Sequence, residues 1–205
     1  RWATHGEPSM VNAHPHVSGN CTHSGSGPVE SEVVGVHNGI IENYTELRAK
    51  LMKNGYTFYS QTDTEVLIKL VDYYYKKYNL GPIDAIAKTM VRVRGSYALE
   101  VMFRDYPGEI WVARKDSPMI IGIADGETYV ASDVPAILKY TRTVYYLGHL
   151  ELARLTPQGI SFFNLDGDEI SKEPVEILWN AEAAEKGGYE HFMMKEIHEQ
   201  PKAVE

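Results

Sequence analysis

Cysteine is almost absent from this sequence. Its single thiol, Cys21, has no second cysteine to pair with among the 205 residues, so an internal disulfide is excluded. One cysteine in a chain of this length is typical of a reducing compartment, and we expect a cytoplasmic location. Cys21 lies in a stretch rich in serine, glycine and asparagine, 17–31, which is typical of a surface loop. The residues around it form no defined activating environment, which makes this thiol a poor candidate for a nucleophile.

Long hydrophobic runs and an excess of basic residues are also missing. No apolar run approaches the roughly 18 residues of a membrane-spanning helix, and no signal-peptide pattern opens the chain, so we expect no membrane partner. The chain has 20 Lys and Arg against 28 Asp and Glu, a formal net charge of -8. Binding to a phosphate backbone needs a basic patch, so nucleic acid is not expected as a partner either.

An initiator methionine is missing as well. The chain begins at Arg1 and ends at Glu205 within a pattern typical of a helix or a linker. We interpret it as a segment of a longer protein. Its length suits one large domain or two small ones, with a substantial core.

Apolar residues follow a helical period in the first half of the chain and strand-like runs in the second. The first pattern predicts helices over 42–53, from 60–65 onward, and over 82–93, with a short strand at 56–59. Turn residues separate the later runs, which predicts a strand meander and a capped helical turn at 133–139. A last helix, 189–201, is predicted to stop at Pro201 and to dock on something outside this chain. Early helices and late strands indicate an α+β sandwich. The predicted later strands are 96–103, 109–114, 119–123, 128–132, 143–147, 150–155, 160–164 and 174–178.

The stretch 33–44 is the one around which the chain is organised. Its β-branched valines predict a strand buried on both faces. Asn38-Gly39 is a strong turn signal, since both residues tolerate positive φ, so we expect the strand to stop there. The side-chain amide of Asn38 and the open backbone N–H of Gly39 are two donors that could stabilise an oxyanion during acyl transfer. From the dipeptide alone, an ordinary tight turn is the better interpretation.

The first nine residues are punctuated by Gly6 and Pro8 as a loop. Within five positions this loop holds a guanidinium, an indole, a hydroxyl and an imidazole. Loops that concentrate such groups often contact substrates, although a solvated terminus would look the same. The four side chains are those of Arg1, Trp2, Thr4 and His5.

Two further positions allow a functional and a structural interpretation. His14 and His16, two residues apart, suggest a metal site, but no carboxylate or cysteine cluster completes a shell and Pro15 holds the chain extended. We therefore expect a loop-structuring role, and neither a metal nor a cofactor. Asp63 lies at a predicted helix start, where capping alone explains a carboxylate. The same carboxylate could face the ammonium of a substrate.

A series of motifs in order along the chain resembles a known family. They read RWATHG (1–6), NAHPH (12–16), HNGIIEN (37–43), TDTE (62–65), RVRGSYA (92–98), ASD (131–133) and MKEIHEQP (194–201). Together they are similar to the class-II glutamine amidotransferase domain, and more narrowly to the glutaminase half of the isomerising glutamine–fructose-6-phosphate transaminases (glucosamine-6-phosphate synthases). The resemblance covers essentially the whole chain.

This resemblance implies a fold, a reaction and partners. The fold is the N-terminal-nucleophile hydrolase sandwich, four layers in the order αββα, with the amidotransferase domain over 1–188. Residues 189–205 would begin a linker to a sugar isomerase domain. The reaction hydrolyses the side-chain amide of L-glutamine and passes ammonia to fructose 6-phosphate, giving glucosamine 6-phosphate. We expect a homodimer at full length.

The resemblance also implies roles for individual residues. Arg1 would bind the α-carboxylate of glutamine, because a guanidinium fork matches a carboxylate, and Asp63 would pair with the α-ammonium. Asn38 and Gly39 would form the oxyanion hole. A loop carrying Trp2, Thr4 and His5 would close over the substrate, and His14 would support it.

One departure from the family pattern is plain. The family nucleophile is a cysteine at the mature N-terminus, whose α-amine serves as the base. Neither Arg1 nor Cys21 matches it, so we expect the nucleophile and the first strands to lie upstream. This predicts that the segment alone has no glutaminase activity. The alternative is a non-catalytic glutamine-binding or scaffold domain of the same fold.

Overall fold

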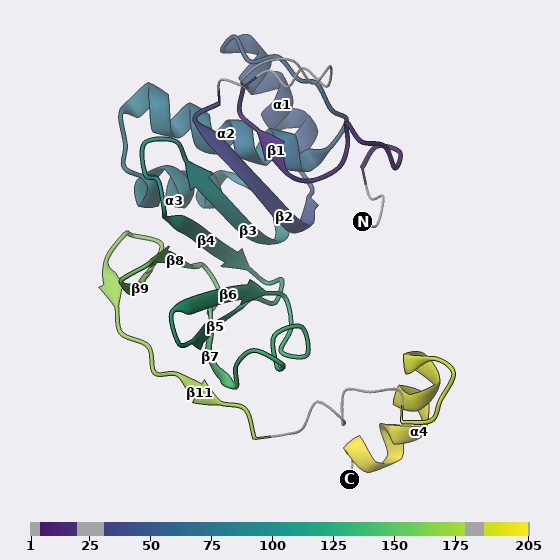
Figure 1. The fold of residues 1–205 in the computed structure, drawn as a ribbon. Coiled ribbons are helices and arrows are strands. Elements are labelled where there is room, and N and C mark those ends of the chain that lie inside the picture. The colour runs from purple at the N-terminus through teal and green to yellow at the C-terminus, as the bar shows by residue number, and fades with distance from the viewer. Residues whose placement is uncertain (1–4, 20–30, 179–186, 205) are drawn as a thin grey trace.

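The computed structural model describes residues 5–19, 31–178 and 187–204, and its strands form two sheets (Figure 1). All strand pairs in both sheets are antiparallel. The larger sheet has the order β1 (His16–Val17), β2 (Val33–Ile41), β3 (Gly95–Phe103), β4 (Ile110–Lys115), β8 (Glu151–Thr156), β9 (Gly159–Phe163) and β10 (Glu169–Ile170). The smaller sheet has the order β11 (Val175–Glu176), β7 (Thr143–Tyr146), β5 (Ile120–Ala124) and β6 (Glu127–Ala131).

Three helices cover the outer face of the larger sheet (Figure 1). They are α1 (Tyr44–Lys53), α2 (Asp63–Tyr78) and α3 (Pro82–Arg92). Helix α2 lies deepest, with every residue from Asp63 to Tyr74 buried, and its start is capped by the Thr62 hydroxyl, which accepts the backbone N–H of Glu65. The main core lies between these helices and the sheet.

A second core lies between the two sheets, where Val112 and Ala153 of the larger sheet face Ile121 of the smaller one. The outer side of the smaller sheet is covered by the segment 133–141, whose Val134, Ile137 and Leu138 are buried against it. This segment is the predicted helical turn, capped by the Asp133 carboxylate, which accepts the N–H of Ala136 at 3.2 Å. Helices, sheet, sheet and helical turn follow one another, which confirms the αββα sandwich.

Two local predictions about strands are wrong. The strand β2 does not stop at Asn38-Gly39 but continues to Ile41, paired with β3 at all nine positions. Long-range pairing overrides the local turn signal here, since glycine accepts both the positive φ of 139° and the close approach of β3. The stretch 56–59 is no strand but irregular chain, and the rings of Phe58 and Tyr59 pack against a buried lysine of α2.

The last helix, α4 (Phe192–Val204), begins later than predicted and does not stop at Pro201. Proline removes one backbone donor, and so close to the end of the helix the remaining turn still forms. The helix lies apart from both sheets (Figure 1), and apolar side chains such as Met193 and Ile197 are exposed on it. The boundary after residue 188 stays a prediction.

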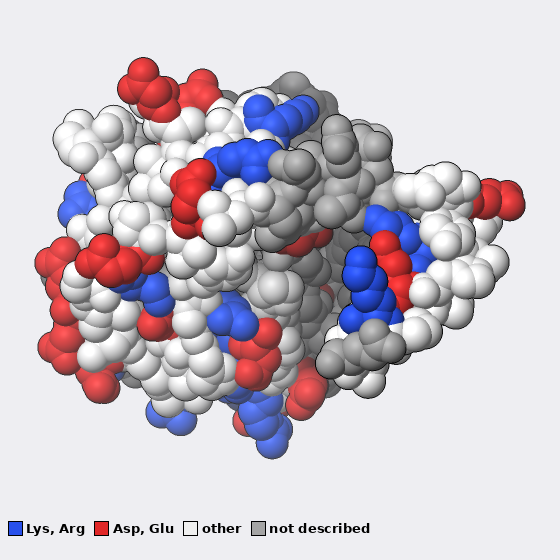
Figure 2. Space-filling model, turned by 90° about the horizontal axis from the view of Figure 1, so that it is seen from below, with Lys and Arg blue, Asp and Glu red and all other residues white. Residues whose placement is uncertain are grey.

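On the face shown in Figure 2, acidic and basic side chains are interspersed over the described residues. Within the described ranges, no helix has the length and apolar character needed to span a bilayer.

Candidate functional site

A buried carboxylate lies where the end of β2 meets the start of α2. Asp63 is the first residue of α2 and is fully buried. Its Oδ2 accepts the backbone N–H of Ile41 at 3.0 Å and lies 3.5 Å from His5 Nδ1 and 3.8 Å from His37 Nε2. Its Oδ1 has no hydrogen-bond partner among the described residues. A buried carboxylate oxygen left open in this way is suited to a cationic or N–H-bearing ligand.

The next residue, Thr64, joins two histidines from different parts of the chain. Its hydroxyl lies 3.1 Å from His14 Nε2 and 2.8 Å from His37 Nδ1. Because His14 belongs to the N-terminal segment and His37 to β2, the first turn of α2 ties three segments into one polar cluster. The ring of His5, which lies beside Asp63, packs edge-on against Tyr44 at 4.5 Å between centroids.

Asn38 reaches the same region from the other face of β2. Successive side chains of a strand point to opposite faces, so His37 is buried toward the helices while Asn38 is exposed. Asn38 lines a pocket of about 220 Å³, to which His14 and His37 also contribute. The pocket therefore connects the amide of Asn38 with the cluster around Thr64. Its other walls come from both sheets: Val36, Ala98, Glu100, Pro118, Met119, Val130, Ala131 and Ser132.

Gly39 could not be replaced without strain. A Cβ at this position would lie 2.0 Å from the carbonyl oxygen of Ser96 and 2.8 Å from Tyr97 Cα. The positive φ already favours glycine.

Glu100 also lines the pocket at Asn38, and burial raises the pKa of its carboxyl above the ordinary value. The pocket thus combines an amide, imidazoles and a carboxyl with a raised pKa.

The second histidine of the NAHPH motif has a different environment. His16 is fully buried, with Nδ1 3.0 Å from the Tyr59 hydroxyl and Nε2 3.1 Å from Thr62 Oγ1. Within the described part of the chain, His, Cys, Asp and Glu side chains form no group of three or more with metal-ligand spacing. The contacts of His14 and His16 are thus those of histidines that fix neighbouring loops through hydroxyl groups.

The structure brings His5, His14 and Asp63 into one cluster, and His14 of this cluster also lines the pocket at Asn38. Arg1, Trp2 and Thr4 lie outside the described residues, as does Cys21. Two members of the cluster were not predicted as site residues, His37 and Thr64. A signal for His37 exists in the sequence, since it is a polar side chain at an inward position of a buried strand and therefore requires a buried partner.

A family model described as "Glutamine amidotransferase domain" matches residues 17–139, more than half of the chain. The chain belongs to this family. The amidotransferase domain is 51% identical over 205 residues to the isomerizing glutamine–fructose-6-phosphate aminotransferase of Caldanaerobacter subterraneus. It is 52% identical over 204 residues to the protein of the same name from Clostridium acetobutylicum. Both comparisons cover 100% of this chain and 31% of the relative, so the chain spans about a third of the length of these curated relatives.

Solved structures show the fold of the amidotransferase domain. Glutamine phosphoribosylpyrophosphate amidotransferase from B. subtilis aligns with a TM-score of 0.61 at 24% identity, over 78% of this chain and 33% of that one. A structure described as the allosteric regulatory enzyme of purine biosynthesis aligns with a TM-score of 0.60, also at 24% identity, over 76% of this chain and 31% of that one. The predicted N-terminal-nucleophile hydrolase fold is confirmed.

Proposed function

We propose that this amidotransferase domain binds L-glutamine and hydrolyses its side-chain amide, as the glutaminase half of an isomerising glutamine–fructose-6-phosphate transaminase. The observation that carries the proposal is the buried Asp63, whose open Oδ1 lies in a polar cluster that also borders the pocket at Asn38. The names of the relatives at about half identity support the same reaction.

Recognition of the amino-acid head would use one charge of each sign. Asp63 Oδ1 would accept the α-ammonium, and this contact satisfies the one oxygen of the carboxylate that the described residues leave open. Arg1 would hold the α-carboxylate through its guanidinium fork. The loop with Trp2, Thr4 and His5 would then close over the substrate and exclude water.

The side-chain amide of glutamine would extend toward the strand. When a nucleophile adds to the amide carbon, negative charge develops on its oxygen, and Asn38 with the N–H of Gly39 would donate to that oxygen. His14 would support the site through Thr64. Ammonia leaves, and water then releases glutamate from the acyl intermediate. By resemblance, the nucleophile is an N-terminal cysteine upstream of these residues, so this segment alone is inactive in our proposal.

The rest of the protein would use the ammonia. In our proposal it aminates fructose 6-phosphate in a sugar isomerase domain that follows the linker 189–205, and the full-length protein is a homodimer in the cytoplasm. We assign no metal or cofactor a role in the glutaminase step.

The decisive experiment uses full-length protein and measures glutamate release against glutamine concentration. Asp63→Asn removes the charge that faces the α-ammonium. Since hydrogen bonds to charged groups contribute roughly 1.5–3 kcal/mol, the KM for glutamine should rise by about ten- to a hundredfold. Asp84→Asn, on the exposed face of α3, is the matched control and should leave the KM unchanged.

A KM for glutamine that is the same in Asp63→Asn and wild type would contradict the assignment of Asp63. The alternative, a non-catalytic glutamine-binding domain, predicts a different pattern. Glutamine would then bind to the full-length protein, as measured by calorimetry, without release of glutamate.

A further inference from the structure

The first turn of α2 buries three consecutive polar residues, Asp63, Thr64 and Glu65, each with no exposed surface. The first two belong to the site described above. Glu65 does not, and its partner Lys69, one turn further along, is 1% exposed. We infer that Lys69 is a positioning residue for glutamine binding, acting through Glu65 on the chain that leads into Asp63. The inference rests on the proposed function of Asp63.

The buried ammonium of Lys69 is in contact with a carboxylate, a backbone carbonyl and two aromatic rings. Nζ lies 2.8 Å from Glu65 Oε1 and donates a hydrogen bond to the carbonyl of Thr57. It also lies 5.0 Å from the ring centroid of Phe58 and 5.2 Å from that of Tyr59, within the range of cation–π attraction. A lysine so placed holds both the carboxylate on its own helix and the chain at 57–59.

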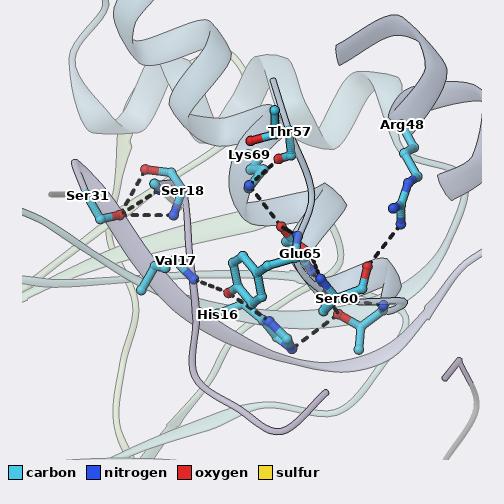
Figure 3. Close-up of polar contacts among 12 residues, drawn as sticks. His16, Val17, Ser18, Ser31, Arg48, Thr57, Ser60, Glu65 and Lys69 are labelled. Atoms are coloured by element: carbon cyan, nitrogen blue, oxygen red, sulfur yellow. Dashed lines mark hydrogen bonds and ion pairs between the residues drawn. The ribbon is translucent and has the colours of Figure 1, made fainter. Parts of the chain in front are cut away.

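The carboxylate of Glu65 binds two backbone amides of the segment that precedes α2 (Figure 3). Its Oε1 accepts the N–H of Tyr59 at 3.0 Å, and its Oε2 accepts the N–H of Ser60 at 2.7 Å. The carboxylate can hold both amides only while it keeps its buried orientation, which Lys69 fixes by charge. Without the ammonium, an unpaired buried carboxylate would be strongly unfavourable and would move toward water.

Further contacts lock the next residues. The hydroxyl of Thr62 accepts the N–H of Glu65 at 3.2 Å and lies 3.1 Å from His16 Nε2. His16 Nδ1 lies 3.0 Å from the hydroxyl of Tyr59, which also accepts the N–H of Val17 at 2.9 Å. The chain from 57 to 62 is therefore held at both ends, and Asp63 follows directly.

Asp63 itself depends on this support. Within the described residues, its side chain is hydrogen-bonded to backbone through the N–H of Ile41, which donates to Oδ2. A shift of the first turn of α2 would move the carboxylate away from β2 and change where Oδ1 points. Lys69 meets Glu65, the carbonyl of Thr57 and the rings at 58–59 rather than Asp63. Its effect on glutamine must therefore be indirect.

The test uses full-length protein with Lys69→Met, which keeps much of the side-chain length and removes the charge. We expect the KM for glutamine to rise about tenfold, below the hundredfold that a misplacement of about 1 Å can cause, with kcat changed by less than about twofold. Hydrogen exchange at the Ile41 amide, which reports the contact with Asp63, should become faster.

Lys76→Met is the matched control, because Lys76 forms an ion pair at the same spacing on the same helix, with Asp72 at 3.3 Å, but is 52% exposed. It should change neither the KM nor the exchange at Ile41. Lys69→Arg, which keeps the charge, should restore both toward wild type. If Lys69→Met fails to fold, the double variant Glu65→Gln/Lys69→Met removes both buried charges and should show the same rise in KM.

The inference is overturned if the Ile41 exchange and the KM stay at wild-type values in the folded variant, or if Lys76→Met changes them equally. Equal acceleration of all amides would also overturn it, since that marks a general loss of stability. The proposed function and the role of Lys69 can be contradicted separately. A wild-type protein that releases no glutamate contradicts the proposed function, while the exchange at Ile41 still decides whether Lys69 positions Asp63.

Discussion

Replacement of Gly39 by alanine is the most direct test of the geometry of β2. Gly39 has φ of 139°, and a Cβ there would lie 2.0 Å from the carbonyl oxygen of Ser96. Both atoms that would collide belong to β2 and β3, which are paired along the whole length of β2. The collision cannot be relieved by a side-chain rotation, so β2 and β3 would have to separate locally.

The size of the effect follows from two unfavourable terms and one favourable term. A non-glycine residue in this backbone region costs about 1–3 kcal/mol, and forcing extra atoms into a packed region costs about 1–3 kcal/mol. Alanine restricts the unfolded chain and returns about 0.4–1 kcal/mol. We expect Gly39→Ala to lower the free energy of unfolding by about 1–5 kcal/mol, a large part of the roughly 5–15 kcal/mol typical of a domain.

The assay is urea unfolding followed by circular dichroism, with Gly55→Ala as the control. Gly55 has φ of 89°, but a Cβ there would meet no atom within 4 Å. The control therefore keeps the backbone strain and omits the collision, and it should lose only about 1 kcal/mol. Equal losses in the two variants would refute the close approach of β2 and β3 as the reason for glycine.

Three further changes give sharp expectations. Thr62→Ala removes the cap of α2 and should lower the free energy of unfolding by about 1–2 kcal/mol in urea titrations, whereas Thr62→Ser should retain most of it. Burial raises the pKa of Glu100 above 4.5, so the folded state favours its protonated form, and this contribution to stability is present below that pH and lost as the pH rises through the folded pKa. Unfolding at a series of pH values should therefore find Glu100→Gln more stable than wild type near neutral pH, with the difference vanishing in acid. Thr64→Val removes the hydroxyl shared by His14 and His37 and should reduce glutamate release by full-length protein, with Thr64→Ser as the control; equal activities would contradict a role for this hydroxyl.

Much of the fold could be predicted because local and global preferences agree. The apolar stripe of α3 and the proline at its first turn place the helix within one residue of its observed end at Arg92. The strands of the second half were found because turn residues separate them. The segregation of helices and strands along the chain indicates an α+β sandwich, and the family resemblance implies its αββα layers.

The local predictions are wrong where contacts with distant parts of the chain determine the backbone conformation. Asn38-Gly39 has the sequence of a turn, but nine rungs of pairing with β3 hold it in a strand. The aromatic residues at 56–59 suggest a strand, yet the rings of Phe58 and Tyr59 lie against the ammonium of Lys69. Neither outcome is visible in a local window, because each depends on a residue that is distant in the sequence.

In the site, too, some residues can be predicted from the sequence and others depend on distant parts of the chain. Asp63 and His14 could be predicted from motifs, and the structure brings both into one cluster. Thr64 was missed since a hydroxyl in a first helical turn looks like an ordinary capping residue. Its role depends on two imidazoles that arrive from 50 and 27 residues away, which only the folded chain reveals.

The unbroken ladder of β2 has a mechanical consequence. Asn38 and Gly39 belong to a strand, paired with β3 at Ala98 and Tyr97, rather than to a loop. Because this pairing holds the backbone, we expect the donors that we propose for the oxyanion to be in place before the substrate binds, so that little reorganisation opposes the developing charge. Any loop that closes over the substrate must move relative to this fixed strand. We therefore expect slow conformational steps of the reaction to involve segments outside the sheet.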